Sequence, residues 1–130
     1  MRPEAFMQRK AIHMLIDSNP TSVTINRESF VSEKGARKKV TSTVGPFDIA
    51  IYSNVIRTAP VSIQEMVDSV KLDKIEWTGL AKADADISSG GQVVDTFTVE
   101  GKGSFKVKTV VDIETMGIVT GKLLLLEMIR

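Results

Sequence analysis

Few residues in this chain are of types that could do chemistry. Its 130 residues include no cysteine and one histidine, His13. The lack of cysteine excludes a thiolate nucleophile, a disulfide framework and a cysteine-ligated zinc or iron–sulfur site, and a single imidazole excludes any site that needs two. Arg9 and Asp17 flank His13 at helical spacing, so we interpret it as part of an exposed i,i+4 pair rather than as a general base. We therefore expect no catalytic residue, no cofactor and no enzymatic activity.

Four oxygen-bearing residues have the spacing of a calcium-binding loop. Asp84, Asp86, Ser88 and Asp95 match its positions 1, 3, 5 and 12. However, Ser89 stands where this loop requires glycine, and Asp95 is shorter than the glutamate that would hold the ion with both oxygens. We therefore expect a turn with Asx-type hydrogen bonds here and no metal.

A cluster of basic residues lies in a long polar stretch, residues 28–45. This stretch has no regular apolar period and exceeds the usual connection of about 4–6 residues, so we expect a long, mobile loop between two early strands. Its cations, Lys34, Arg37, Lys38 and Lys39, would contact phosphates or an acidic protein surface, or simply be solvated. No aromatic residue interleaves the cluster, which argues against base stacking as in single-strand binders.

The N-terminal segment is predicted to be a helix over residues 3–17. Pro3 suits a first helical position, and Asn19-Pro20 ends the helix. The expected core face collects apolar residues at helical spacing, namely Met7, Ala11, Met14 and Leu15, widened by Ile12 and Ile16. Phe6 falls near the polar face, where it is either a loosely packed helix start or an anchor for a protein partner.

Beyond Pro20 the apolar period changes to two, which predicts about six short antiparallel strands separated by glycine-marked turns. Gly101-Lys-Gly103 predicts a hairpin turn, because no GK[ST] sequence or following helix makes it a phosphate loop. We therefore expect an α+β fold that is mainly β, a small antiparallel β-barrel with an N-terminal helix. Its expected core is Val23, Ile25, Phe47, Ile49, Ile51, Trp77, Phe97, Val99, Phe105, Val107 and Val111.

Two further segments carry structural signals. Ser62-Ile-Gln-Glu65 fits a capping box, which predicts a short helix within residues 53–73. The leucine-rich last strand, within residues 118–128, lacks alternation, so both of its faces should be covered, one by core and the other by helix or a neighbouring subunit. Leu124 and Leu126, together with Phe6, are therefore our candidate protein interface.

Length, composition and charge predict one soluble domain spanning residues 1–130. Apolar residues make up 42% of the chain and charged residues 25%, as in ordinary globular proteins, and the net charge is +1. Residues 1–39 carry eight basic and four acidic residues, whereas residues 48–95 carry four and eight. This asymmetry suits head-to-tail contacts between copies, or it mixes on folding. We expect neither a membrane span nor a secretory signal, and therefore an intracellular protein.

An ordered set of segments resembles a known family. The segments are Asn19-Pro20-Thr-Ser-Val-Thr-Ile ending in Arg27, Gly45-Pro46-Phe47, Leu80-Ala81 with Ala83-Asp84-Ala85-Asp86-Ile87, and Asp95-Thr-Phe97 with Gly101-Lys-Gly103-Ser-Phe105-Lys-Val107. In this order they resemble the head–tail connector proteins of long-tailed phages and defective prophages, the head-completion or stopper family. The resemblance covers most of the chain from about Ala11 onward, and residues 53–73 match least well.

This resemblance implies a β-barrel protomer that forms a homo-oligomeric ring below the portal and adaptor rings, although the isolated chain could be a monomer. Such a ring retains packaged DNA and provides the surface for tail attachment. Residues 28–45 would be the loop that lies toward the DNA channel. The implied partners are portal or adaptor proteins, tail proteins and, non-specifically, packaged DNA, with no membrane. The implied location is the head–tail junction of the virion, after assembly in the host cytoplasm.

Two alternative functions remain open at this point. One is another connector component such as a tail terminator, and the strand-rich pattern disfavours a helical adaptor. The other is an oligonucleotide-binding small β-barrel, which needs aromatic platforms on its strands. Trp77, Phe97 and Phe105 are the candidates, but they occupy positions expected in the core. A structural assembly protein is therefore the leading hypothesis.

Overall fold

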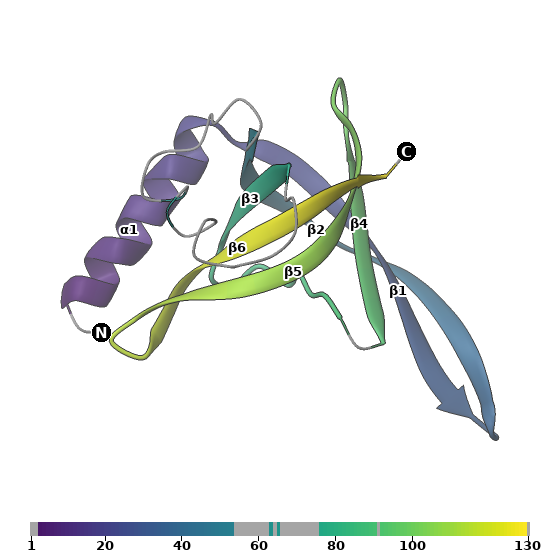
Figure 1. Cartoon of the computed structure of the whole chain (residues 1–130). Coiled ribbons are helices and arrows are strands. Elements are labelled where there is room, and N and C mark those ends of the chain that lie inside the picture. Colours follow the sequence, from purple (N-terminus) through teal and green to yellow (C-terminus); the bar gives the residue numbers. More distant parts are fainter. Residues whose placement is uncertain (1–2, 54–62, 64, 66–75, 91, 130) are drawn as a thin grey trace.

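The computed structural model describes residues 3–53, 63, 65, 76–90 and 92–129, which form a helix and six strands. The elements are α1 (Pro3–Ser18), β1 (Thr21–Glu33), β2 (Ala36–Ser53), β3 (Trp77–Lys82), β4 (Val93–Val99), β5 (Gly103–Thr115) and β6 (Ile118–Ile129). The strands close an antiparallel barrel in the order β1-β2-β3-β6-β5-β4, and α1 packs on its outside (Figure 1). The predicted α+β fold, a small barrel with an N-terminal helix, is confirmed.

The barrel consists of two three-stranded meanders, β1-β2-β3 and β4-β5-β6. They join where β1 pairs with β4 and where β3 pairs with β6. Two of the hairpins turn through two residues with positive φ, Lys34-Gly35 between β1 and β2, and Met116-Gly117 between β5 and β6. Such turns match the right-handed twist of the flanking strands. The predicted hairpin turn around Gly101 lies between β4 and β5 and is confirmed.

The hydrophobic core has two layers, one inside the barrel and one between the barrel and α1. Ala85 and Ile87, from the connection between β3 and β4, pack into the inner layer, so this connection covers one end of the barrel (Figure 1). Of the predicted core, Val23, Ile25, Ile49, Ile51, Phe97, Val99, Phe105 and Val107 are buried, whereas Phe47, Trp77 and Val111 are half-buried.

The leucine run is covered on both faces, as predicted, and α1 supplies the outer cover. Leu124 and Leu126 point into the barrel, while Leu123 and Leu125 pack under the helix. The assignment of Leu124 and Leu126 to an exposed protein interface was therefore wrong, because their side chains are at most 1% exposed. The side chains of this strand do alternate between the barrel interior and the helix. The sequence does not show this, because both sides are covered and all four positions are leucine.

The buried face of α1 differs from the predicted one. Ala5, Ile12 and Ile16 face the barrel, whereas Met7 and Met14 point into solvent. The helix approaches β6 closely enough that a Cβ on Gly121 would lie 2.8 Å from Ile12 Cδ1. Because apolar residues lie on several sides of this helix, its own sequence did not determine which side would pack on the sheet.

The stretch predicted as a long loop, residues 28–45, is instead an ordered continuation of β1 and β2. The two strands pair up to Glu33↔Ala36, so the connection is the two-residue turn rather than a loop of eighteen residues. The β-prone sequence of residues 40–44 and the tight turn favour a ribbon over a loop. Gly45-Pro46 lies within β2, where the register shift leaves both residues opposite Thr24.

The helix predicted around Ser62 falls largely outside the described residues. Ile63 and Glu65 are described there; both are helical, and Ile63 is buried in the layer beneath α1. Among the described helical residues, none forms a helix long and apolar enough to cross a membrane.

Candidate functional site: the β1–β2 arm and its anchor

The outer parts of β1 and β2 form a two-stranded ribbon that projects from the barrel (Figure 1). We call this ribbon, residues 28–41, the arm. Six cross-strand pairs join residues 28–33 to residues 36–41, which corresponds to a length of about 17–20 Å at the usual rise per residue. At its base, Glu28 and Ser29 also pair with β4. The arm therefore presents two exposed faces beyond the barrel.

The structure places the four predicted basic residues on different sides of the arm, and all four are exposed. Successive side chains of a strand point to opposite faces. Lys38 lies on the face that continues the barrel interior, which we call the inner face, whereas Arg37 and Lys39 lie on the opposite, outer face. Lys34 occupies the turn at the tip.

The cations on the outer face make contacts within the chain. The Arg37 guanidinium lies 4.4 Å from the centre of the Phe30 ring, and its Nη2 donates a hydrogen bond of 2.9 Å to Gln92 Oε1. Lys39 Nζ lies 3.0 Å from Glu28 Oε1. The sequence prediction found no aromatic residue in the cluster, because Phe30 reaches it only through the antiparallel pairing of β1 and β2.

The inner face of the arm carries two exposed valines beside Lys38. Val31 pairs directly with Lys38, and Val40 lies diagonally across from Val31 on the same face. The two valines are 45% and 40% exposed. A projecting sheet face with exposed β-branched residues is a candidate contact surface for another protein segment.

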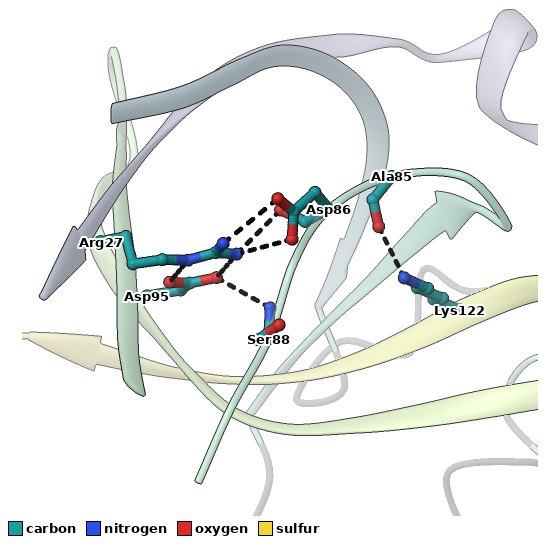
Figure 2. A network of polar contacts seen from close by, with 6 residues as sticks. All are labelled: Arg27, Ala85, Asp86, Ser88, Asp95 and Lys122. Atoms are coloured by element: carbon teal, nitrogen blue, oxygen red, sulfur yellow. Dashed lines mark hydrogen bonds and ion pairs between the residues drawn. The ribbon is translucent and has the colours of Figure 1, made fainter. Parts of the chain in front are cut away.

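An arginine and two aspartates anchor the base of the arm to the barrel (Figure 2). Arg27 in β1 lies directly opposite Asp95 in β4. Its Nε and Nη2 donate hydrogen bonds of 2.8 and 2.9 Å to Asp95 Oδ1 and Oδ2. The Asp95 side chain is fully buried, and the Ser88 amide donates a further hydrogen bond of 2.8 Å to Oδ2. The buried carboxylate is therefore paired with a cation and hydrogen-bonded on both oxygens.

The same guanidinium also binds the connection between β3 and β4. Nη1 and Nη2 of Arg27 donate to the Asp86 carboxylate at 3.2 and 3.0 Å, and Nη2 also donates to the Asp86 carbonyl at 3.1 Å. One side chain thus joins β1, β4 and the connection that covers the end of the barrel (Figure 2). We call Arg27, Asp86, Ser88 and Asp95 the anchor.

Protonation in the anchor follows from these contacts. The hydrogen bonds from Arg27 lower the pKa of Asp86 below its ordinary value. Burial opposes this shift, and the positive charges of Arg27 and Lys122 add to it. The hydrogen bonds to Asp95 and Asp86 raise the pKa of Arg27. At neutral pH Arg27 and Asp86 are therefore both charged.

The residues with calcium-loop spacing thus have a different role in the fold. Asp86 and Asp95 accept hydrogen bonds from Arg27, the Ser88 amide donates to Asp95, and Asp84 is exposed. Among the described residues, no group of three or more acidic or histidine side chains is arranged to hold a metal ion. The predicted Asx-type turn is replaced by a contact to an arginine 59 or more positions away in the sequence.

The hairpin of β5 and β6 extends from another side of the barrel (Figure 1). Asp112 and Glu114 in β5 are exposed and follow Val110, which packs against the inner core layer, so they share the inner side of the hairpin. Lys122, opposite Asp112, donates a hydrogen bond of 2.6 Å from its Nζ to the Ala85 carbonyl (Figure 2). Exposed carboxylates therefore dominate this surface.

Phe6, which the sequence predicts as a contact to a protein partner, is 58% exposed on α1. Met7 and Met14 are exposed beside it at 69% and 64%. His13 is half-buried on the same helix, and Asp17 forms a 3.7 Å ion pair with Lys82. The role of Phe6 in partner binding stays a prediction, with its exposure as the structural basis.

Comparison of this chain with protein-family models, curated proteins and solved structures found no match.

Proposed function

We propose that this protein is a structural head–tail connector of a long-tailed phage or prophage. It forms a ring below the portal and adaptor rings, retains the packaged DNA and provides the surface to which the tail attaches. The observation that carries the proposal is a small barrel that buries its own core and projects an ordered, cationic arm. An arm of this kind has no role in covering the core, so its natural use is contact with other molecules.

The segments that resemble the connector family support this proposal by their positions in the fold. Arg27, Asp86 and Asp95, each of which belongs to one of those segments, meet in the anchor. Gly45-Pro46 marks the register shift opposite Thr24, between the arm and the middle of β2, and Gly101 lies in the β4–β5 turn. The matching residues thus belong to the parts of the chain that set the arm and close the barrel.

The ordered arm changes how the ring would act on DNA. A mobile loop would lose backbone entropy when the ring forms, at a free-energy cost of about 1–2 kcal/mol per residue. A ribbon that is already paired in the free chain avoids this cost. In the ring, Lys34 at the tip and the cations of the outer face would either line the channel and meet DNA phosphates, or face an acidic surface of the adaptor.

The alternative of an oligonucleotide-binding barrel has less support. Phe97 and Phe105 are at most 1% exposed, and their ring centres lie 5.6 Å apart inside the core. Neither ring is available to stack on a base. The third candidate, Trp77, is half-buried and packs edge-on against Phe105. Binding to nucleic acid would therefore depend mainly on exposed cations such as those of the arm.

Electron microscopy of capsids tests the proposed function. Capsids that carry the portal and adaptor of the same genome are incubated with the purified protein and imaged beside untreated capsids. We expect additional ring-shaped density below the adaptor and, with tails present, joined particles. Capsids that show no added density after incubation with saturating protein would refute the proposal.

A further inference from the structure

We propose that the edge of β2 that faces away from β1 accepts an additional strand from an acidic segment of another protein. We call this edge, residues 37–43, the acceptor edge. The inference rests on the proposed function for the identity of that protein, which would be a neighbour of this chain at the head–tail junction. It names the surface of the arm and the kind of segment that would join the two.

β2 has strand partners on both of its sides only near its end. It pairs with β1 over residues 36–49 and with β3 over residues 50–53. Within the described part of the chain, no strand pairs with the other side of residues 36–49. Residues 36–43 are all exposed, on the ribbon that projects from the barrel (Figure 1). This side of the arm is therefore an open sheet edge, a structure to which extended segments add as strands.

The backbone groups of β2 point toward this edge at every second residue. The Phe30 amide donates a hydrogen bond of 2.9 Å to the Gln92 carbonyl, so it points away from β2. Lys39, directly opposite Phe30, is then in a non-hydrogen-bonded pair, and its own N–H and C=O point away from β1. The same alternation applies to Arg37, Thr41 and Thr43. The acceptor edge therefore presents outward donors and acceptors in alternation along about 20 Å.

The chain limits the acceptor edge at both ends. The Lys34-Gly35 turn ends it at the tip of the arm. Toward the barrel, Gly45-Pro46 lies at the register shift, and a proline has no N–H to donate to an added strand. A partner strand of about seven residues fits between these limits. Because the arm is already paired in the free chain, it loses little backbone entropy when the partner binds.

The side chains of the acceptor edge favour an acidic partner. Residues 36–47 include Arg37, Lys38 and Lys39 and no carboxylate, and the whole arm carries four basic and two acidic residues. The arm thus keeps an excess of positive charge even where its cations pair within the chain, as Lys39 does with Glu28. Opposite charges on neighbouring strands stabilise their pairing. A strand with carboxylates at alternate positions therefore complements this edge.

A second copy of the same edge is a poorer occupant. It would place three more cations on the strand next to Arg37, Lys38 and Lys39, and like charges on neighbouring strands are destabilising. Lysine on an open edge is a common protection against pairing between identical strands. The residues that oppose pairing between copies thus select a partner of the opposite charge.

Nucleic acid matches only part of the acceptor edge. Phosphate oxygens attract cations and accept hydrogen bonds from backbone N–H groups, but they donate none. The outward carbonyls of Lys39 and Thr41 would therefore gain no donor from a phosphate backbone. An added strand supplies both a donor and an acceptor at each of these positions.

Amide hydrogen exchange, followed by NMR for each residue, tests this inference. The labelled protein is measured alone and with a short peptide in which valine alternates with glutamate. The matched control is the same peptide with its central valine replaced by proline, which keeps the charge but interrupts the strand. A short DNA duplex is the third probe.

In the free chain the amides of Lys38 and Val40, which face β1, should exchange slowly, and the outward amides should exchange fast. The acidic peptide should slow exchange about ten-fold or more at the outward amides, and the proline-containing peptide should have little effect. The outward amides that report binding are those of Lys39, Thr41 and Thr43.

A pair of variants separates the backbone from the side chains. Thr41→Pro removes one outward N–H and leaves the hydrogen bonds between β1 and β2 in place, because Thr41 lies in a non-hydrogen-bonded pair with Glu28. Thr41→Val keeps the N–H and is the matched control. We expect Thr41→Pro to lose the peptide and Thr41→Val to bind it. Slow exchange at Lys38 in both variants shows that the arm is still paired.

Three results would overturn the inference. The first is exchange at the outward amides that the acidic peptide leaves unchanged. The second is equal slowing by the two peptides, because charge alone would then account for binding. The third is slowing by the DNA duplex and not by the acidic peptide, which would assign the edge to nucleic acid.

These results are independent of the test of the proposed function. Protected outward amides with no added density on capsids would keep the acceptor edge and refute the connector role. Ring density on capsids with unprotected amides would keep the connector role and refute the acceptor edge.

Discussion

Arg27 Nε and Nη2 both donate to the carboxylate of Asp95, at 2.8 and 2.9 Å, across the pairing of β1 and β4. Asp95 is fully buried, and Arg27 is 17% exposed. This pair fixes the point at which β1 leaves the barrel and becomes the arm. The orientation of the proposed contact surface thus depends on a polar interaction in the wall of the barrel.

The first prediction concerns the stability of this pair. Arg27→Leu should lower the free energy of unfolding by about 3–5 kcal/mol, because it leaves a buried carboxylate without its cation. Lys39→Leu is the control, since it removes an exposed cation that pairs with Glu28, and should cost less than about 1 kcal/mol. Urea denaturation measures both. An Arg27→Leu variant as stable as the Lys39→Leu variant would contradict the role of the anchor.

The second prediction concerns pH. Arg27 holds the pKa of Asp86 below its ordinary value of 3.8 in the folded chain. A carboxyl group with a lowered folded pKa stabilises the fold above its ordinary pKa, and this contribution is lost as pH falls through the folded pKa. The difference in free energy of unfolding between the parent and Asp86→Asn should therefore be largest near neutral pH and shrink in acid.

Urea denaturation at a series of pH values from about 6 to about 2 measures this difference. The Asp86 side chain is 61% exposed, so solvent screens the interaction and the difference at neutral pH should be modest. A difference that stays constant over the whole series would show that the ionisation of Asp86 does not contribute.

The third prediction concerns the barrel core. Phe105 is fully buried and packs edge-on against Trp77, with 5.5 Å between the ring centres. Phe105→Ala should cost about 3–5 kcal/mol through lost burial and the cavity that remains. Phe6→Ala, on the exposed side of α1, should change the free energy of unfolding by no more than about 0.5 kcal/mol. Equal losses at the two positions would contradict the assignment of core and surface.

The fourth prediction concerns Phe6 as a contact to a partner. Phe6→Asp should leave the fold nearly intact, because the side chain is 58% exposed, and should weaken incorporation of the protein into capsids. Ala11→Asp makes the same change of charge at another exposed position of the same helix and serves as the control. Co-sedimentation with capsids measures incorporation. Equal incorporation of the parent and both variants would remove Phe6 from the proposed interface.

The sequence predicted the barrel well because its signals are local. Apolar alternation marks the strands that contain Ile49, Phe97 and Phe105, and glycines mark the turns at Gly101 and Gly117. A buried strand face and a tight turn each require particular residue types within a few positions. Local patterns of this kind are visible without knowledge of the fold.

The sequence analysis predicted a loop in place of the arm, because neither face of the arm packs on a hydrophobic core. Without a buried face there is no apolar alternation to read along residues 28–41, and polar ribbons then resemble loops. The Lys34-Gly35 turn was the available signal, since glycine at the second position suits a turn with two positive φ values. The four cations were found, but their division between two faces follows only from the register.

The anchor and the docking of α1 depend on contacts that are distant in sequence. Arg27 is 59 positions from Asp86 and 68 from Asp95, so no spacing rule connects them. Because Gly121 has no Cβ, the Ile12 side chain can pack directly on β6. This close contact determines which side of α1 is buried, although the helix has apolar residues on several sides. Such features become visible only when the strands are placed in order around the barrel.

Removal of the arm tip tests the central claim most directly. Deletion of residues 33–39 joins Ser32 to Val40 and leaves the Ser29↔Val40 pair to close a three-residue turn, with the anchor intact. Capsids completed with this variant are assayed for bound protein and for nuclease-protected DNA. We predict loss of the packaged DNA, with the variant still bound if the arm gates the channel and unbound if the arm makes the assembly contacts. Capsids that bind the variant and retain their DNA as fully as those completed with the parent protein would contradict a role for the arm in closing the capsid.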